Sequence, residues 1–469
     1  PLPNKKQQMK KTILSLSFAL LLFSCNKKDT TETAANADEK FEAYKEQFVE
    51  SLWKLNPDWA ASQGYHKYDS VLVIPNADNQ KQILDATKAQ LDSLSNYDVE
   101  TLSDNNKTDF HMMKNLLEGT LFSINEIKSS EWDPSGYNVS GAFAEILNGS
   151  YDALENRLRN FNLKMKNIPA YYEAAKQSIK NPTVEHTELA IAQNLGGISV
   201  FEADLNTALA KSKLSQIEKD EILAKAKTAV KAIQDYASWL QKLDNKTPRS
   251  FRLGKELYAK KFDFDIQSGY TAETIYQKAI GQKKELHEKM FVLADKLWSK
   301  YMANAPKPSD KLLLIRQVID KISLQHTTPE NFQSEIEKQI PELTAYVKEK
   351  DLLYIDPSKP LVVRKEPDYM AGVAGASISA PGPYDKNANT YYNVGSLSGW
   401  SKEESESYLR EYNDYILQIL NIHEAIPGHY TQLVYSNQSP SIIKAILGNG
   451  AMIEGWAVYT ERMMLESGY

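Results

Sequence analysis

The sequence is organised around the stretch His423-Glu424-Ala425-Ile426-Pro427-Gly428-His429. It contains two histidines and a glutamate that directly follows the first of them. A second glutamate, Glu454, opens the stretch Glu454-Gly455-Trp456-Ala457 further along the chain. Imidazole and carboxylate groups are the usual protein ligands of catalytic zinc, and a carboxylate often serves as the base. The residues therefore predict a zinc-type centre built on helices.

A helix is predicted to lead into this stretch. Ser401 and Glu404 have the spacing of a capping box, which marks the start of a helix. Apolar and aromatic residues then recur at helical spacing, and His423 continues the same stripe. Because successive helical residues are rotated by about 100°, we expect the imidazole of His423 to point into the interior. The stripe consists of Tyr408, Tyr412, Tyr415, Ile416, Ile419 and Leu420.

The second histidine is not where a straight zinc helix would place it. In that motif the histidines are four residues apart and share a face, whereas His429 follows His423 by six residues. Six residues turn an ideal helix by about 600°, which leaves the two side chains roughly 120° apart. Pro427 breaks the helical hydrogen-bond pattern and Gly428 accepts unusual dihedral angles. We therefore expect a bulged or widened turn that brings His429 back; the alternative is a helix that ends at Ile426, with His429 in a loop.

Glu454 and Glu461 are expected to lie together on the next helix. Ala457 and Val458 share the face of Glu454. A carboxylate on such a small, apolar face needs a partner, and a metal ion would serve. The alternative is a glutamate in the first helical turn that complements the helix dipole.

The N-terminal residues have the features of a bacterial lipoprotein signal. Met9 starts a basic patch, which is followed by the apolar run 12–23 and by Cys25, the only cysteine of the chain. The run is too short to cross a bilayer as a mature helix. We predict a signal peptide over residues 1–24 and lipid on Cys25. A flexible linker should follow, because residues 26–39 have no large apolar side chain. An ordinary secretory signal with an incidental cysteine is the alternative.

Residues 40–469 are predicted to fold as a mainly α-helical domain, with a subdivision near residue 250. Amphipathic stretches alternate with short connections that contain Pro, Gly and Asn, a pattern typical of long antiparallel helices. The helical stretches cover residues 40–55, 78–96, 101–128, 151–179, 183–211, 215–243, 271–301, 309–325 and 328–348.

A small β-sheet is predicted directly before the motif helix. Three short β-prone segments, residues 361–364, 375–379 and 389–394, are separated by Pro and Gly. We expect an antiparallel or mixed sheet. Its strand edges could hold an extended peptide; alternatively, the sheet only supports the helix.

The composition excludes some classes of partner. Hydrophobic residues make up 42% of the 469 residues and charged residues 25%, enough for a sizeable core. The net charge of -6 indicates no broad basic surface. We therefore expect no nucleic-acid partner.

Two longer motifs carry a family resemblance. HEAIPGHYTQ, which starts at His423, and EGWAVYTERM, which starts at Glu454, resemble the signature of the bacterial family called domain of unknown function 885 (DUF885). The likeness extends to residues 56–60, 253–258 and 362–394. Members of this family are grouped with the zinc-helix, gluzincin-like metallopeptidases. The resemblance therefore implies a mainly helical zinc hydrolase.

The resemblance also implies roles for individual residues. His423, His429 and Glu454 would be the ligands of one Zn²⁺ per chain. Glu424 would be the general base for the water that attacks a peptide bond, and Glu461 would orient a ligand histidine. An oxyanion donor would be one of three tyrosines, among which the sequence does not choose: Tyr384, Tyr391 and Tyr392.

Two features depart from the family pattern. Position 430 is Tyr, where family members often have another histidine. The chain also ends at Tyr469, directly after the second motif. We expect that the C-terminal helices of the family are missing, and that activity would need residues which they supply.

Two functions from different classes fit these observations. The first is a zinc-dependent peptidase that is anchored by lipid on Cys25 in the bacterial cell envelope, on the periplasmic or surface side, and acts on peptides. The second is a non-catalytic envelope lipoprotein that binds peptides or glycans on a helical scaffold. The sequence leaves the oligomeric state open.

Overall fold

The computed structural model describes residues 26–359, 361–372, 375–385 and 387–469, with side chains described from Asn36 onward. The predicted signal peptide and Cys25 lie outside the described residues, so both stay predictions. No helix within the described ranges is long and apolar enough to span a bilayer.

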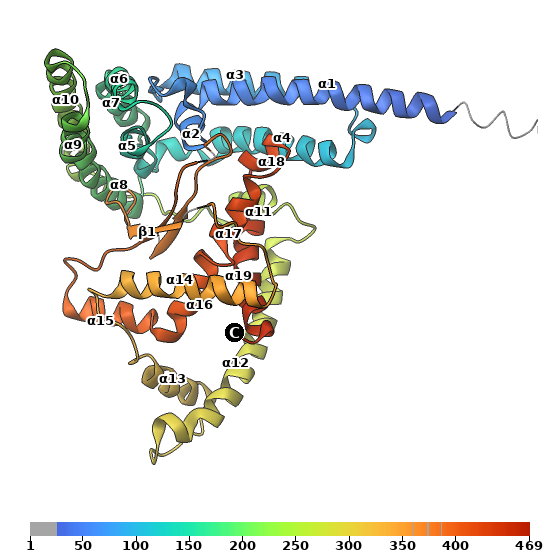
Figure 1. The fold of residues 1–469 in the computed structure, drawn as a ribbon, viewed down its shortest axis with the longest axis vertical. Helices are drawn as coiled ribbons and strands as arrows, with labels where there is room; N and C mark the ends of the chain where they lie inside the picture. Colours follow the sequence, from blue (N-terminus) through green and yellow to red (C-terminus); the bar gives the residue numbers. More distant parts are fainter. Residues whose placement is uncertain (1–25, 360, 373–374, 386) are drawn as a thin grey trace, which may run out of the picture.

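The described residues are mainly helical with a small mixed sheet, which confirms the predicted fold class (Figure 1). In the first half, α3 packs on α4 beside α1, and α10 packs on α7 and α8. The helices of this half are α1 (Asn26–Leu55), α2 (Pro57–Ser62), α3 (Ala77–Leu94), α4 (Asp104–Phe122), α5 (Ser140–Asn148), α6 (Leu154–Met165), α7 (Ile168–Ser178), α8 (Val184–Gly196), α9 (Ala203–Lys211) and α10 (Gln216–Gln241). Short turns connect them: η1 (His66–Tyr68), η2 (Val99–Thr101), η3 (Ser123–Ile127), η4 (Ser129–Glu131), η5 (Pro134–Gly136) and η6 (Gly197–Phe201).

Helix α1 differs from the predicted N-terminal organisation. It begins at Asn26, so the residues expected as a flexible linker are helical in the structure. Ala, Glu and Lys in this segment favour a helix. The helix also continues into a part held by packing, since Phe41 and Phe48 are 0% and 2% exposed. A stretch without apolar residues can therefore extend an anchored helix.

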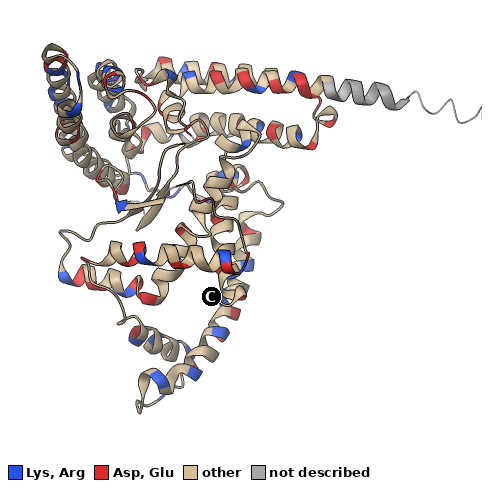
Figure 2. Ribbon diagram, in the orientation of Figure 1, with Lys and Arg blue, Asp and Glu red and all other residues tan. Residues whose placement is uncertain are grey.

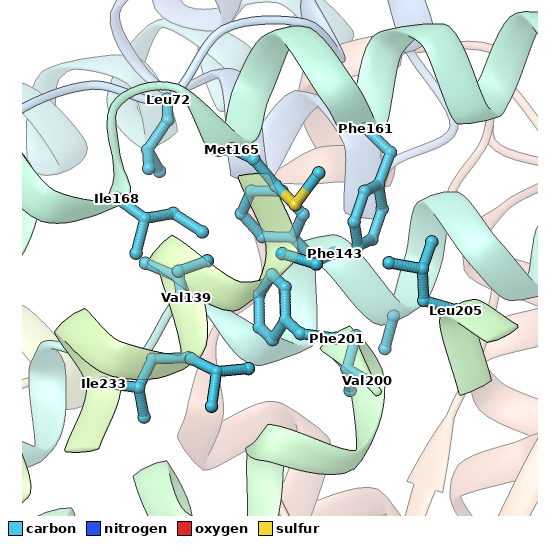
Figure 3. Packing of buried hydrophobic residues seen from close by; sticks show 14 of the residues in the cluster. Leu72, Val139, Phe143, Phe161, Met165, Ile168, Val200, Phe201, Leu205 and Ile233 are labelled. Carbon is cyan, nitrogen blue, oxygen red and sulfur yellow. The ribbon is translucent and has the colours of Figure 1, made fainter. Parts of the chain in front are cut away.

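A large apolar core holds α5 to α10 together (Figure 3). Phe143 lies at its centre, with ring centroids 4.8 Å from Phe161 and 5.0 Å from Phe201. Leu205 and Ile233 close the cluster from α9 and α10, and both are fully buried. Burial of each such side chain contributes on the order of 1.5–3 kcal/mol.

Two predicted long helices are each divided in the structure. The stretch expected over 151–179 forms α6 and α7, because Pro169 has no amide hydrogen and lies in the first turn of a new helix. The stretch expected over 183–211 is divided by Gly196 and Gly197 into α8, η6 and α9. Periodicity alone does not show such breaks, because the apolar pattern runs through them.

The second half of the chain carries an arm and a compact unit around the sheet. Helices α12 and α13 pack on each other and extend away from the sheet (Figure 1). The elements are α11 (Lys255–Ile266), α12 (Ala272–Met302), α13 (Lys311–Ile322), α14 (Phe332–Glu349), β1 (Leu361–Lys365), β2 (Ala376–Ser379), β3 (Thr390–Val394), α15 (Lys402–Glu411), α16 (Asp414–Glu424), α17 (His429–Ser436), α18 (Ile442–Ile446) and α19 (Gly450–Ser467).

The sheet has the strand order β1-β3-β2, with β1 parallel and β2 antiparallel to β3. Its apolar face includes Tyr392, Val394 and Ala376, which share a core with residues of α14 and α16. Tyr392 is fully buried, and its hydroxyl donates to Oδ1 of Asn421 in α16 at 2.9 Å. The sheet is thereby bonded to the helix that ends in the motif.

The helix predicted to lead into the motif is also divided. Ser401 and Glu404 form the expected capping box at α15, but α15 ends at Glu411 and Asn413 caps the new helix α16. The break rotates part of the expected stripe out of the core, while Tyr408, Tyr412 and Leu420 still pack against it. Tyr415, Ile416 and Ile419 are therefore exposed, at 44%, 41% and 41%, and the buried apolar residues of α16 are Leu417 and Ile422.

Charged residues of both signs are interspersed along the helices (Figure 2). Several form i,i+4 ion pairs on exposed faces, such as Lys81 with Asp85 and Lys231 with Asp235. Such pairs are typical of solvated faces of amphipathic helices. The absence of a nucleic-acid partner stays a prediction.

Candidate metal centre

Three helices supply the predicted ligands. His423 and Glu424 end α16, His429 begins α17, and Glu454 and Glu461 lie on α19. Helix α19 packs against both α16 and α17. The site is therefore assembled where two helix ends meet the side of a third.

The turn between the histidines is neither of the two forms considered from the sequence. Helix α16 ends at Glu424, and Ala425 has φ -111° and ψ -85°. The Ile426–Pro427 peptide bond is cis, and a new helix begins at His429 after Gly428. The expected approach is nevertheless present, because the two imidazole centroids are 4.8 Å apart. An interrupted helix, rather than a bulged one, brings His429 back.

The ligand atoms converge at distances that suit zinc. Nε2 of His423 and Nε2 of His429 lie 3.5 Å and 3.6 Å from the same oxygen, Oε2 of Glu454. All three ligand atoms lie within 4.8 Å of one another. Tetrahedral Zn²⁺ with bonds of about 2.0–2.1 Å has ligand atoms roughly 3.4 Å apart. These contacts are longer than good hydrogen bonds. The positions of the three side chains therefore suit shared binding of a metal ion better than direct hydrogen bonds to one another.

Glu461 contacts the imidazole of His423. Its Oε1 lies 2.7 Å from Nδ1 of His423. A carboxylate in this position keeps the proton on Nδ1 and leaves Nε2 as a free lone pair. Nε2 is the atom that faces Glu454. The structure thus places Glu461 where the sequence predicted an orienting carboxylate.

His429 is more deeply placed than His423, with 11% against 21% of its side chain exposed. Burial lowers the pKa of His429, and the nearby Glu454 carboxylate opposes this effect. A neutral imidazole is the form that binds a metal. Nδ1 of His429 and Oε1 of Gln432 are both buried without a hydrogen-bond partner among the described residues.

Glu424 is a partly buried carboxylate with a raised proton affinity. Burial raises its pKa to about 7; the charge of His423 opposes the shift and Glu454 adds to it. Within the described part of the chain, no hydrogen bond or ion pair holds its carboxylate. A group with these properties exchanges a proton readily near neutral pH.

Trp456 and Gly428 shape the turn; the sequence predicted a role in the turn for Gly428 but none for Trp456. The indole Nε1 of Trp456 donates to the carbonyl oxygen of Pro427 at 3.1 Å. A Cβ at Gly428 would lie 1.8 Å from the carbonyl oxygen of His423, so only glycine fits there. Trp456, two residues after Glu454, was the signal in the sequence for this contact, because a buried indole N–H needs a hydrogen-bond acceptor.

The three candidate oxyanion tyrosines lie in different surroundings. The hydroxyl of Tyr384 accepts from Nε1 of Trp53 at 3.4 Å. Tyr391 lies under the guanidinium of Arg364. Tyr392 is fully buried and bonded to Asn421, which argues against contact with a substrate. Tyr384 and Tyr391 stay predictions.

Tyr430 takes no part in the ligand set. It is 3% exposed, and its hydroxyl donates to the backbone carbonyl of Lys359 at 2.7 Å. The side chain thus points to the segment before β1. Within the described residues, the candidate ligand set contains His423 and His429 as its two histidines.

The family described as "Bacterial protein of unknown function (DUF885)" matches residues 57–469. The chain belongs to this family. This DUF885 protein is also similar to a solved candidate lipoprotein of unknown function from Shewanella oneidensis. The two are 51% identical, with a TM-score of 0.75, over 92% of this chain and 78% of the other.

A second solved structure shows the same fold at low identity. It is a candidate lipoprotein from Colwellia psychrerythraea, 15% identical, with a TM-score of 0.69, over 92% of this chain and 78% of the other. None of the curated proteins matches this DUF885 protein.

Proposed function

We propose that this DUF885 protein is a zinc-dependent peptidase of the bacterial cell envelope. The observation that carries the proposal is the convergence of His423, His429 and Glu454, whose two histidine-to-glutamate distances are near the edge length of a zinc tetrahedron, next to the partly buried carboxylate of Glu424. Glu454 is 67% exposed, so the ligand set opens toward solvent on one side. An open side is what distinguishes catalytic from structural zinc sites.

The protein's own groups have defined tasks in such a reaction. Zinc held by the three ligands would supply Lewis-acid chemistry toward the peptide carbonyl. Glu424 accepts a proton from the attacking water as its oxygen adds to the carbonyl carbon. Glu424 then delivers the proton to the amine nitrogen as the C–N bond breaks. Glu461 holds the ring of His423 in place throughout, through its contact with Nδ1.

Peptides are the substrates that the surroundings favour. Strand β2 pairs with β3 on one side only, so its other edge is unpaired within the sheet. An extended peptide adds to such an edge through backbone hydrogen bonds. Helix α16 contacts β2, which brings this edge to the helix that carries His423.

Anchoring in the envelope rests on the sequence and on the relatives. Both solved relatives are described as candidate lipoproteins. The basic patch, apolar run and Cys25 of this chain have the same implication. We propose that lipid on Cys25 holds the protein to a membrane while α1 leads into the folded part.

The test is metal content together with peptide hydrolysis. Reconstituted protein should hold one zinc per chain and cleave members of a peptide library. Glu424→Gln should retain the metal and lose hydrolysis. A metal content of zero after reconstitution would refute the proposal.

The non-catalytic alternative makes the opposite prediction. A glycan- or peptide-binding lipoprotein should keep its affinity for the ligand when His423, Glu424, His429 or Glu454 is replaced. The carboxylate of Glu424 weighs against this interpretation, since an unpaired acid withdrawn from water destabilises a fold that has no use for it. Zinc titration of wild type and His429→Ala separates the two functions.

A further inference from the structure

A cavity lies on the face of the sheet opposite to the α14 and α16 core. It has a volume of about 580 Å³ and is lined by residues of β1, β3, α2 and α5, among them Arg364, Tyr391 and Glu145. Small-ligand sites commonly have volumes of about 300–1,000 Å³. The volume of this cavity is therefore in the range of small-ligand sites.

The strand register explains why this wall is polar. Arg364 is paired with Asn393, and Asn393 with Ser377, so these side chains share one face. The neighbouring position, Tyr392, points to the apolar core. Asn393 is fully buried and donates to Oγ of Ser379 at 2.8 Å. The polar side chains on this face are therefore hydrogen-bonded to one another and not only to water.

Arg364 is held in one orientation but has no anionic partner among the residues that the structure describes. Its guanidinium lies 3.9 Å from the ring centroid of Tyr391, and Nε donates to Oδ1 of Asn393 at 2.7 Å. Within the described ranges no carboxylate forms an ion pair with it. A planar guanidinium fixed in this way, with its terminal amino groups free, is suited to bind a carboxylate by two parallel hydrogen bonds.

The helical wall of the cavity carries a carboxyl group. Glu145 of α5 lines the cavity. The surrounding protein desolvates its carboxylate and raises its pKa to about 7, helped by the charge of Asp58. Lys164 is fully buried and forms an ion pair with Asp58. Because Asp58 is paired with Lys164, it is the carboxylate of Glu145, when ionised, that favours a cationic group of a ligand, whereas Arg364 favours an anionic one.

We infer that this cavity binds short zwitterionic peptides, with Arg364 as the receptor for the terminal carboxylate and Glu145 facing the terminal ammonium group. That the zwitterion is a peptide, rather than another amino acid derivative, rests on the proposed function. The cavity wall is bonded to the candidate metal centre through β3, since Tyr392 holds Asn421 just before His423. A ligand here therefore lies on the strand that also supports the motif helix.

The test is calorimetric binding of Ala-Ala, its C-terminal amide and its N-acetyl form to the full chain stripped of metal. Binding needs neither zinc nor turnover, so the result is independent of whether the protein is a peptidase. Ala-Ala should bind about 10- to 100-fold more tightly than the amide, because a charge-assisted pair is lost. The N-acetyl form should also bind more weakly at pH 8, where Glu145 is ionised.

Matched variants assign the effect to Arg364. Arg364→Gln should weaken Ala-Ala binding by the same factor and remove the difference between acid and amide. Lys365→Gln, at the next position on β1 and pointing to the other face, should bind like wild type. Equal binding of acid and amide by wild type, no binding of either, or wild-type affinity in Arg364→Gln would overturn the inference. If Arg364→Gln does not fold, Arg364→Lys replaces it. The difference in binding between Ala-Ala and its amide in wild type then still tests the inference.

Discussion

The indole Nε1 of Trp456 lies 3.1 Å from the carbonyl oxygen of Pro427 and 3.3 Å from that of Gly428. Trp456 belongs to α19, the helix that carries Glu454 and Glu461. This contact joins the turn between the histidines to the helix of the third ligand. Trp456 is therefore placed to help fix the turn relative to all three candidate ligands.

Trp456→Phe should loosen this turn. The ring remains, but the carbonyl groups lose their donor, which costs about 1–2 kcal/mol of unfolding free energy. We expect weaker zinc binding in a chelator competition and a lower midpoint of urea unfolding. Tyr459→Phe is the control, because Tyr459 is on the same helix and 55% exposed. Equal zinc affinity in both variants would contradict the role of Trp456.

Gly428→Ala should disrupt the centre more strongly. A Cβ there would lie 1.8 Å from the carbonyl oxygen of His423 and 2.3 Å from that of Ile422, so the backbone has to move. We expect loss of stoichiometric zinc, measured by elemental analysis after reconstitution. Gly281→Ala in α12 is the control, since nothing lies within 4 Å of its Cβ. That change should stabilise the protein by about 0.5–1 kcal/mol.

Glu461→Gln should reduce zinc affinity about 10- to 100-fold, because ligand-orienting carboxylates contribute that much. The amide still reaches Nδ1 of His423 but no longer carries the charge that favours the Nδ1–H tautomer. Glu466→Gln is the control: Glu466 lies on the same helix and forms a surface ion pair with Arg462. Competition with a chelator measures both variants. The same loss in Glu466→Gln would show a general effect of charge.

Glu145→Gln should change the pH dependence of stability. The pKa of Glu145 is raised from 4.5 to about 7 in the folded protein. The folded state thus binds more protons than the unfolded state between these values, and wild-type stability falls as pH rises through this window. Glutamine removes this loss. The variant should therefore gain stability over wild type at pH 8 and none at pH 4, as measured by urea unfolding.

Glu50→Gln should change the pH dependence of stability in the opposite direction to Glu145→Gln. Hydrogen bonds from Lys67, Tyr65 and Tyr68 lower the pKa of Glu50 to about 2. Its contribution to stability is present above pH 4.5 and is lost as pH falls through the folded value. Glu50→Gln should thus be less stable than wild type at pH 7, with the difference shrinking toward pH 2. Parallel pH profiles for the two variants would contradict both assignments.

Much of the fold was predictable because it depends on local patterns. The capping box at Ser401 and the start of α10 after Ser215 follow from short-range hydrogen bonds that the sequence spells out. The three strands lie where β-prone segments were found. The break at Asn413 was missed, because a capping asparagine inside an apolar pattern resembles a polar residue on a helix surface.

The sequence by itself determined which residue types meet: two imidazoles, a carboxylate beside one of them, and carboxylates on a later helix. It also indicated, through Pro427 and Gly428, that the turn between the histidines departs from a straight helix. The tertiary structure decided that His429 begins a new helix, that Glu461 takes Nδ1 of His423, and that Trp456 holds the turn. These contacts join residues far apart in the chain, so their geometry depends on how α19 packs against α16 and α17, which no local pattern specifies.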